Sequence, residues 1–110
     1  MLAVQFIFQP GTYDEDFHTL DDAIDTYAKS LEGYLGVDRW VSEDGSRVNA
    51  IYYFSDNDSL ALLSRYPDHL AAKKQVTRWY EGYQIVVSEV TGMWGDGRIS
   101  HPAVARPDSH

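Results

Sequence analysis

The hydrophobic residues at the start of the chain alternate with more polar ones. Because successive side chains of a strand point to opposite faces, this period of two predicts a strand over residues 2–9 with one strongly apolar face. Pro10 and Gly11 end the pattern. The apolar face is formed by Leu2, Val4, Phe6 and Phe8.

The next segment has the period of a helix. Asp14, Glu15 and Asp16 open it, and negative charge is favourable at the positive end of a helix. Apolar residues then recur three or four positions apart, which predicts an amphipathic helix that ends near Gly33. These residues are Phe17, Leu20, Ile24, Tyr27, Ala28 and Leu31.

Two strands separated by a turn follow this helix, at residues 35–41 and 47–54. The residues between them include Asp44 and Gly45, and an Asp-Gly pair is favoured in two-residue hairpin turns. The two strands are therefore predicted to be antiparallel neighbours. The second of them carries apolar residues on both faces.

A second helix and a last strand are predicted around Pro67 and Gly82. Proline disfavours helix in the residue before it, and Asp68 can cap a first turn, so the helix is expected over residues 69–81. Gly82 suits the left-handed geometry of a helix end. Residues 83–90 follow as a strand that is apolar on both faces.

These elements, with a short helix at residues 60–63, give the order strand, helix, strand, strand, helix in two pieces, strand. This βαββαβ order predicts an α+β protein with a ferredoxin-like sandwich, in which both helices cover one face of an antiparallel four-stranded sheet. The predicted domain spans residues 1–94. Residues 95–110 form a C-terminal tail that could pack on a partner subunit.

The predicted strands are apolar on both faces, although one helical layer covers only one face. An uncovered apolar sheet face usually meets another protein surface. We therefore expect a homodimer that forms through the sheet face.

Composition narrows the range of partners. The formal net charge is −8, whereas binding to phosphate groups depends on clustered basic residues, so we expect no nucleic-acid and no membrane partner. The chain has no cysteine, which excludes disulfides, thiolate nucleophiles and iron–sulfur sites. No apolar run approaches membrane-spanning length, and no basic flank of a secretory signal precedes the first strand. The expectation is a cytoplasmic protein.

His69 is the candidate catalytic residue. It lies in line with the apolar stripe of the predicted second helix, and the near-neutral pKa of histidine suits a general base. The alternative is that His69 bonds a backbone carbonyl and helps hold the start of the helix. His18 has helical spacing to several aspartates, but without a second histidine this group is better explained as solvated surface, so no metal site is expected.

Six aromatic and amide residues are candidates for a substrate pocket. Their side chains could stack on a ring or bind a substrate oxygen, and the alternative is that they pack in the core or in a dimer interface. No glycine-rich phosphate loop and no nucleophile elbow is present. The candidate pocket residues are Trp40, Asn49, Tyr52, Phe54, Trp79 and Tyr80.

Five short segments, taken together with the element order, carry a resemblance to a known family. They are residues 31–36 (LEGYLG), 52–56 (YYFSD), 69–73 (HLAAK), 79–83 (WYEGY) and 95–97 (GDG). Over residues 2–92 the chain resembles the antibiotic biosynthesis monooxygenase family of dimeric α+β barrels. The last two segments are similar to those of a subgroup of small uncharacterised proteins.

The resemblance implies a dimer whose sheets close into a barrel, with a pocket between the helices and the sheet of each subunit. Members of the family oxidise phenolic polyketides with molecular oxygen and without metal or flavin, degrade haem, or isomerise small signalling molecules. Because one fold supports such different chemistry, the resemblance implies the fold more strongly than the activity.

Several residues depart from the family's functional patterns. Haem-degrading members have an asparagine on the first strand, a tryptophan on the third and a histidine ligand further along the last helix. This chain has Gln5, Phe54 and Lys73 at the corresponding places, which argues against haem degradation. Polyketide-oxidising members carry a tryptophan near the Phe54 position and an asparagine on the same face, whereas Asn49 has the opposite parity.

The leading hypothesis from the sequence is a cofactor-independent monooxygenase-like enzyme that acts on a small aromatic or quinol-type metabolite. Such chemistry needs an electron-rich substrate that is deprotonated in an apolar pocket, with His69 as the candidate base and without cofactor. The alternatives are a non-catalytic dimeric protein that binds small molecules and an isomerase or cyclase on a polyketide-like substrate. A cavity of substrate size beside His69 would favour the enzymes.

Overall fold

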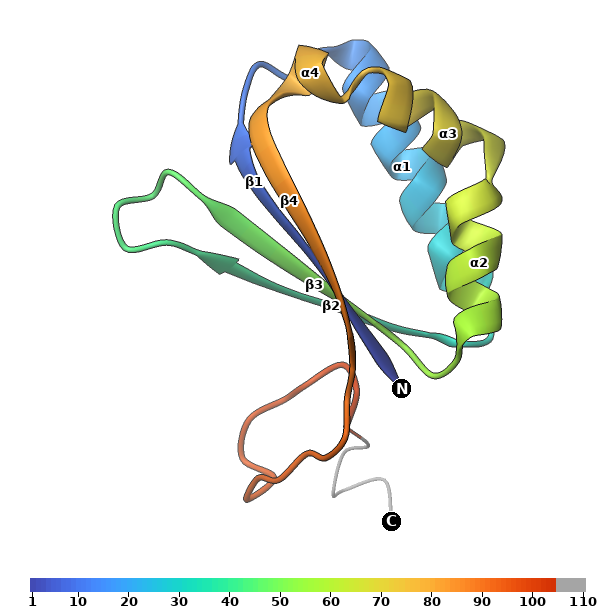
Figure 1. Cartoon of the computed structure of the whole chain (residues 1–110), viewed down its shortest axis with the longest axis vertical. Helices are drawn as coiled ribbons and strands as arrows, with labels where there is room; N and C mark the ends of the chain where they lie inside the picture. Colours follow the sequence, from blue (N-terminus) through green and yellow to red (C-terminus); the bar gives the residue numbers. More distant parts are fainter. Residues whose placement is uncertain (105–110) are drawn as a thin grey trace.

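The computed structural model describes residues 1–104 of the chain (Figure 1). The element order confirms the predicted βαββαβ arrangement, with the second helical region divided into three helices. In chain order the elements are β1 (Leu2–Pro10), α1 (Glu15–Ser30), β2 (Tyr34–Val41), β3 (Val48–Phe54), α2 (Asn57–Arg65), α3 (Pro67–Lys74), α4 (Val76–Trp79) and β4 (Tyr80–Glu89).

The four strands form one antiparallel sheet in the order β2-β3-β1-β4. All the helices lie on the same side of this sheet (Figure 1). The register places Phe6 of β1 opposite Ala50 of β3 and Ile85 of β4, and it places Arg39 of β2 opposite Ala50. These four residues therefore form one row across the face that the helices cover, which we call the helix-facing side.

The core lies between the helices and the helix-facing side of β1 and β3. Its centre is a cluster of Ala28, Phe54 and Leu63, from α1, β3 and α2. Full burial of hydrophobic side chains is rare within residues 1–104, and the large side chains of Phe54 and Trp79 are the most completely enclosed.

The edge strand β4 is open to solvent on both faces. Tyr83, Ile85 and Val87 point to the helix-facing side and are 52%, 48% and 55% exposed, and Val86 on the opposite, outer face is 37% exposed. A strand with apolar residues on both faces is normally covered on both. The helices of this chain do not supply that cover.

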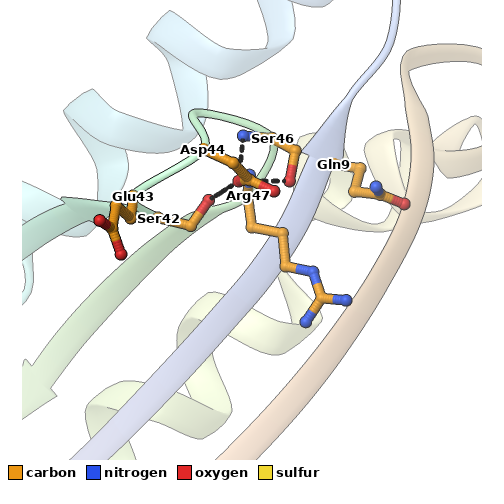
Figure 2. A pocket seen from close by; sticks show the side chains of 6 residues that line it. All are labelled: Gln9, Ser42, Glu43, Asp44, Ser46 and Arg47. Carbon is orange, nitrogen blue, oxygen red and sulfur yellow. Dashed lines mark hydrogen bonds between the residues drawn. The ribbon is translucent and has the colours of Figure 1, made fainter.

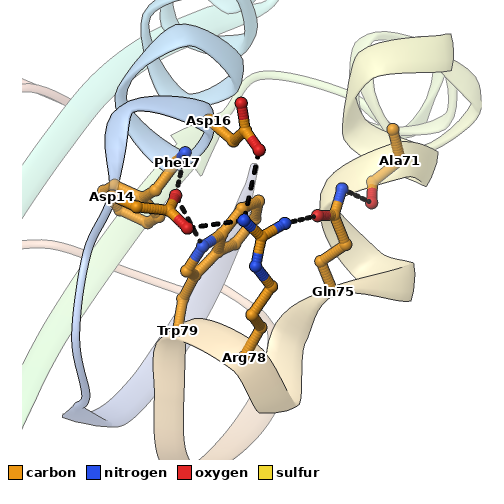
Figure 3. A network of polar contacts seen from close by, with 7 residues as sticks. All are labelled: Asp14, Asp16, Phe17, Ala71, Gln75, Arg78 and Trp79. Atoms are coloured by element: carbon orange, nitrogen blue, oxygen red, sulfur yellow. Dashed lines mark hydrogen bonds and ion pairs between the residues drawn. The ribbon is translucent and has the colours of Figure 1, made fainter.

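The start of α1 is tied to the junction between α4 and β4 through Asp14. Its side chain caps α1 by accepting a hydrogen bond from the Phe17 amide at 2.9 Å, and it accepts a second from Trp79 Nε1 at 3.1 Å (Figure 3). Arg78 lies 2.6 Å from Asp14 and 3.1 Å from Asp16. One carboxylate thereby joins residues that are far apart in the sequence.

The last helical region differs from its prediction at both ends. The helix breaks at Gln75 and stops at Trp79, and β4 begins at Tyr80. Gly82 is part of β4, where it pairs with Gln9, and has no left-handed conformation. The predicted cap at Gly82 is therefore wrong, because pairing with β1 extends the strand further back along the chain.

Two smaller predictions about helix ends are also wrong. The N-cap of α3 is Tyr66 without a side-chain hydrogen bond, and Asp68 lies inside the first turn. The short helix predicted at residues 60–63 is part of the longer α2, which Asp56 caps by accepting a hydrogen bond from the Ser59 amide at 3.0 Å.

The hairpin between β2 and β3 is confirmed, but its loop is wider than a two-residue turn. Ser42 and Arg47 pair across a loop of four residues, in which Gly45 has a φ of 78°. Asp44 accepts hydrogen bonds from the Ser46 amide and from the hydroxyls of Ser42 and Ser46 (Figure 2). These bonds, with the Ser46 amide as the largest cause, lower the pKa of Asp44 to about 2.

The tail lies against the outer face of its own sheet as far as the structure describes it. The ring of His101 is 4.8 Å from that of Tyr53, and Pro102 sits above Gly36, where a Cβ would be 2.7 Å from the proline. Of the predicted tail 95–110, residues 105–110 lie outside the described residues. No helix in the described part of the chain is long and apolar enough to cross a membrane.

Gly33 is required for close packing between α2 and the start of β2. Its amide donates a 3.0 Å hydrogen bond to Ser59 Oγ, and a Cβ on Gly33 would lie 2.4 Å from that oxygen. The substitution Gly33→Ala should therefore lower the free energy of unfolding by about 1–3 kcal/mol, as overpacking of a buried site does. Urea unfolding followed by tryptophan fluorescence measures the change.

The control for this experiment is Gly95→Ala. A Cβ at Gly95 would meet nothing within 4 Å, so this variant should keep the stability of the parent protein. Equal stability of the two variants would contradict the packing assigned to Gly33.

Candidate functional site

His69 lies on α3, which packs mainly against α1 and α2. The side chain is half-buried, and its Nδ1 is buried without a hydrogen-bond partner among residues 1–104. Burial lowers the pKa of His69, and the positive charge of Lys73 adds to the effect. The imidazole is therefore held in its neutral form, which can accept a proton.

The two most distinct hollows lie away from His69. The larger, of about 700 Å³, is lined by Gln9 and by residues of the hairpin between β2 and β3 (Figure 2). The smaller, of about 200 Å³, is lined by residues that include Ile7, Trp40 and Asn49. Ile7, Trp40 and Asn49 belong to one row of the outer face. The expected cavity beside His69 is not one of these two.

The six predicted pocket residues do not come together in one place. Trp40 and Asn49 lie on the outer face, where Trp40 is 63% exposed and Asn49 donates a 2.9 Å hydrogen bond to Gln5. Phe54 and Trp79 are enclosed in packing, with 1% and 2% exposure. Only Tyr52 and Tyr80 are left as polar candidates between the helices and the sheet.

Tyr80 belongs to an aromatic cluster on the helix-facing side, above β1. Its ring centroid lies 5.2 Å from that of Phe6, 5.0 Å from that of Phe8 and 5.9 Å from that of Tyr13. Tyr13 in turn stacks on Phe17 at 4.0 Å. We call these five residues the aromatic cluster, and their edge-to-face contacts are the geometry that aromatic pairs prefer.

Arg39 is a polar residue of this side that was absent from the predicted site. It faces the helices from the edge strand β2, opposite Ala50, whose side chain is a single methyl group and is fully buried. Its positive charge acts on Tyr13, Tyr52, Tyr80 and on the carboxyl of Asp21 from α1, and it favours the ionised form of each. We call these five residues the Arg39 cluster.

Burial dominates the electrostatics of the Arg39 cluster. It raises the pKa values of Tyr52 and Tyr80 against the opposing effect of Arg39, so both hydroxyls stay protonated and can donate hydrogen bonds. Burial also raises the pKa of Asp21. The neighbouring Tyr34 has its pKa raised to about 12, again chiefly by burial.

The sequence does contain a signal for Arg39 and Asp21. Arg39 interrupts the apolar positions Val37 and Val41 on the helix-facing side of β2. Asp21 is four residues after Phe17, on the stripe that Ile24 and Ala28 continue, and its side chain is exposed, as predicted for solvated surface. In each case one charged residue stands in an otherwise apolar stripe.

The acidic residues near His18 serve the fold. Asp14 caps α1 and binds Arg78 and Trp79. Within residues 1–104, no group of three or more histidine, cysteine or acidic side chains is arranged to hold a metal ion.

The antiparallel sheet with its helices on one side is a ferredoxin-like fold, the fold named for a similar solved structure of a dabb family protein from Mesorhizobium loti. Solved structures with this fold include Rv0793 from Mycobacterium tuberculosis, which is 19% identical, with a TM-score of 0.66 over 86% of this chain and 98% of that one. They also include SnoaB, a cofactor-independent oxygenase from Streptomyces nogalater, at 10% identity and a TM-score of 0.64 over 84% of this chain and 94% of SnoaB.

A third similar structure is an antibiotic biosynthesis monooxygenase that is 13% identical, with a TM-score of 0.62 over 84% of this chain and all of the other. At these identities the likeness concerns the fold. No family model and no curated protein matches the sequence.

His69 should make stability depend on pH. Because its folded-state pKa lies below the ordinary value of 6.5, the unfolded chain takes up the proton first as pH falls, and stability is lost below about pH 6.5. In His69→Gln the loss of stability between about pH 7.5 and pH 5 should be smaller. Urea midpoints at the two pH values measure it.

The matched control is Leu70→Gln, at the exposed position next to His69 on α3, which introduces no titratable group. It should keep the pH dependence of the parent protein. An identical pH dependence in His69→Gln and the parent would show that the His69 pKa is not lowered by folding.

Proposed function

We propose that this protein is a cofactor-independent monooxygenase-like enzyme that acts on a small aromatic or quinol-type metabolite. The observation that carries the proposal is the Arg39 cluster beside the aromatic cluster, on the helix-facing side of the sheet. The fold supports it, because a protein described as a cofactor-independent oxygenase has the same one.

The chemistry explains why these residue types suit the reaction. Molecular oxygen accepts an electron readily from an electron-rich anion, so the substrate itself supplies the electrons once a base has removed its proton. Aromatic side chains hold a planar ring, and a few polar groups among them orient its oxygens. Tyr52 and Tyr80 supply hydrogen-bond donors, and Arg39 supplies a positive charge.

Two residues are candidates for the base. His69 remains a candidate because its imidazole is neutral and Nδ1 has no partner among the described residues. Asp21 is a second candidate because it belongs to the Arg39 cluster and because burial raises its pKa toward neutrality.

The proposed assembly is a homodimer formed through the sheet. The supporting observation is the apolar surface that the helices leave open, which includes Val86 and Trp40 on the outer face at 37% and 63% exposure. Covering that surface with the same surface of a second copy would give a two-fold symmetric contact.

Oxygen uptake with a panel of hydroquinones tests the activity. We expect uptake without added metal or flavin and in the presence of a chelator. Either His69→Ala or Asp21→Asn, whichever removes the base, should lower the rate by about 10²-fold or more, because a general base contributes about 10²–10⁴-fold.

Asp58→Asn, at an exposed position of α2 away from both clusters, is the matched control, with an expected rate equal to that of the parent protein. No oxygen uptake with any member of the panel would overturn the monooxygenase proposal. Binding of a hydroquinone without turnover would instead favour the non-catalytic binding protein, and conversion without oxygen uptake would favour the isomerase or cyclase.

Sedimentation velocity at micromolar concentration tests the dimer. The parent protein should sediment at twice the mass of the chain, and Val86→Asp should weaken the association at least tenfold because it places a charge in the apolar contact. Leu62→Asp, at an exposed position of α2, should remain dimeric. A monomeric parent protein would refute the proposal.

A further inference from the structure

Trp94 lies in the tail that follows β4, and its side chain is almost entirely open to solvent. At 93% exposure it is the most exposed of the large hydrophobic residues in the described part of the chain. An indole ring carries a large apolar surface, and tryptophan is among the residues that dominate the energy of protein contacts. A tryptophan that its own chain leaves in water therefore indicates a contact with another molecule.

A hollow of matching size lies on the outer face of the sheet. Its volume is about 200 Å³, close to that of one aromatic side chain, and its lining includes Ile7, Trp40 and Asn49 of one row across the sheet, with Arg47 from the hairpin. An aromatic ring in this hollow would lie against Trp40 and beside the Arg47 guanidinium, and both contacts favour such a ring.

Asn49 offers the hollow a hydrogen-bond acceptor that lacks a donor. Its Nδ2 donates to Gln5, whereas its Oδ1 is buried without a partner among the described residues. The other two tryptophans donate their N–H to Asp38 and Asp14, and Trp94 has no such acceptor within residues 1–104. The last torsion of asparagine is soft, so a modest turn of the amide presents Oδ1 to an indole N–H, which is a donor only.

The hollow and the tail lie at opposite ends of the sheet (Figure 1). The tail starts where β4 ends and returns to the outer face at Tyr53, which His101 contacts. From Tyr53 to Asn49 the distance along β3 is about 13 Å at the rise of a strand. The exposure of Trp94 shows that the hollow is not filled by the tryptophan of the same chain.

A second copy brings the hollow and the tryptophan together. When two outer faces meet about a two-fold axis that lies between them and perpendicular to the strands, the strands of the two copies run in opposite directions. The tail end of each sheet then lies over the hairpin end of the other. Because the tail already rests on the outer face, it would lie between the two sheets.

We propose that Trp94 of each copy inserts into the hollow beside Trp40 and Asn49 of the other, so that the tails are exchanged across the dimer. This inference rests on the homodimer of the proposed function, and it names the residue and the recess that hold the dimer together. Trp94 Nε1 donates to Asn49 Oδ1 of the other copy. An apolar contact of this kind suits a chain with a net charge of −8, whose charged surfaces repel those of a second copy.

Dissociation constants from sedimentation test the insertion. Trp94→Ala should weaken the dimer at least tenfold, as truncation of a central tryptophan does, and Trp40→Ala should do likewise. The double variant should weaken it by less than the product of the two single effects, because both changes remove the same contact. Trp94→Phe, which keeps a ring without the N–H, should retain part of the affinity.

Leu62→Ala is the matched control, because it truncates an exposed apolar residue of α2 in the same way. It should keep the dissociation constant of the parent protein. Since Trp94 makes little contact with its own chain, Trp94→Ala should also keep the circular dichroism of the folded parent.

Introduced cysteines identify the chain from which the tryptophan comes. The chain has no cysteine of its own. Ser42→Cys lines the hollow, and Gly95→Cys lies next to Trp94, where a Cβ meets nothing within 4 Å. When these two single variants are mixed and joined by a short bismaleimide, mass spectrometry should find a product with one chain of each kind. Leu62→Cys in place of Ser42→Cys should give none.

The proposal is overturned if Trp94→Ala keeps the parent's dissociation constant, if the effects of Trp94→Ala and Trp40→Ala multiply, or if the mixed product does not form. A double variant with Ser42→Cys and Gly95→Cys that is joined only within one chain also overturns it. These results leave the dimer itself standing, whereas a monomeric parent protein refutes both the dimer and the insertion. Oxygen uptake is a separate readout that bears on neither.

Discussion

The register of β1 against its two neighbours is the constraint on which the rest of the structure depends. It places Phe6 beside Ala50 and Ile85, and Ala50 beside Arg39. Because strand side chains alternate between faces, a slip of one residue would turn the apolar face of β1 to the outside and carry Phe6 away from Tyr80. The core, the aromatic cluster and the row that holds Arg39 all follow from this one alignment.

The carboxylate of Asp14 holds the helical layer to that sheet. It caps α1 and accepts a hydrogen bond from Trp79 Nε1, immediately before the chain enters β4 (Figure 3). A buried indole without an acceptor is costly, and Trp79 is 2% exposed. The hydrogen bond from Trp79 to Asp14 therefore fixes where α4 ends, and with it the position of Tyr80 above β1.

The fold could be predicted from the sequence because periodicity, turn residues and charge at helix ends act locally. The end of the last helix could not be predicted, because glycine by itself is a residue that often ends helices. Whether Gly82 ends the helix or belongs to the strand depends on its pairing with Gln9, far away in the chain. The candidate site was predicted still less well. Trp40 and Tyr52 are both aromatic strand residues, and only their parity, once the register is known, assigns them to opposite faces. The sequence does not mark Arg39 or Asp21 as a site residue, because both are charged and exposed and only the register brings Arg39 to the helix-facing side.

The two faces of the sheet carry different chemistry, so the dimer contact and the ligand site that we propose lie on opposite faces. The outer face offers apolar residues and an amide pair between Asn49 and Gln5, which suits contact with a second copy. The helix-facing side offers tyrosines whose hydroxyls stay protonated and a guanidinium without an acidic partner among the described residues. Because alternate residues of each strand serve opposite faces, Asn49 faces the proposed contact with a second copy while the adjacent Ala50 is buried under the helices. A substitution on one face should therefore change the proposed association or the proposed ligand binding separately, provided that the register of β1 is kept.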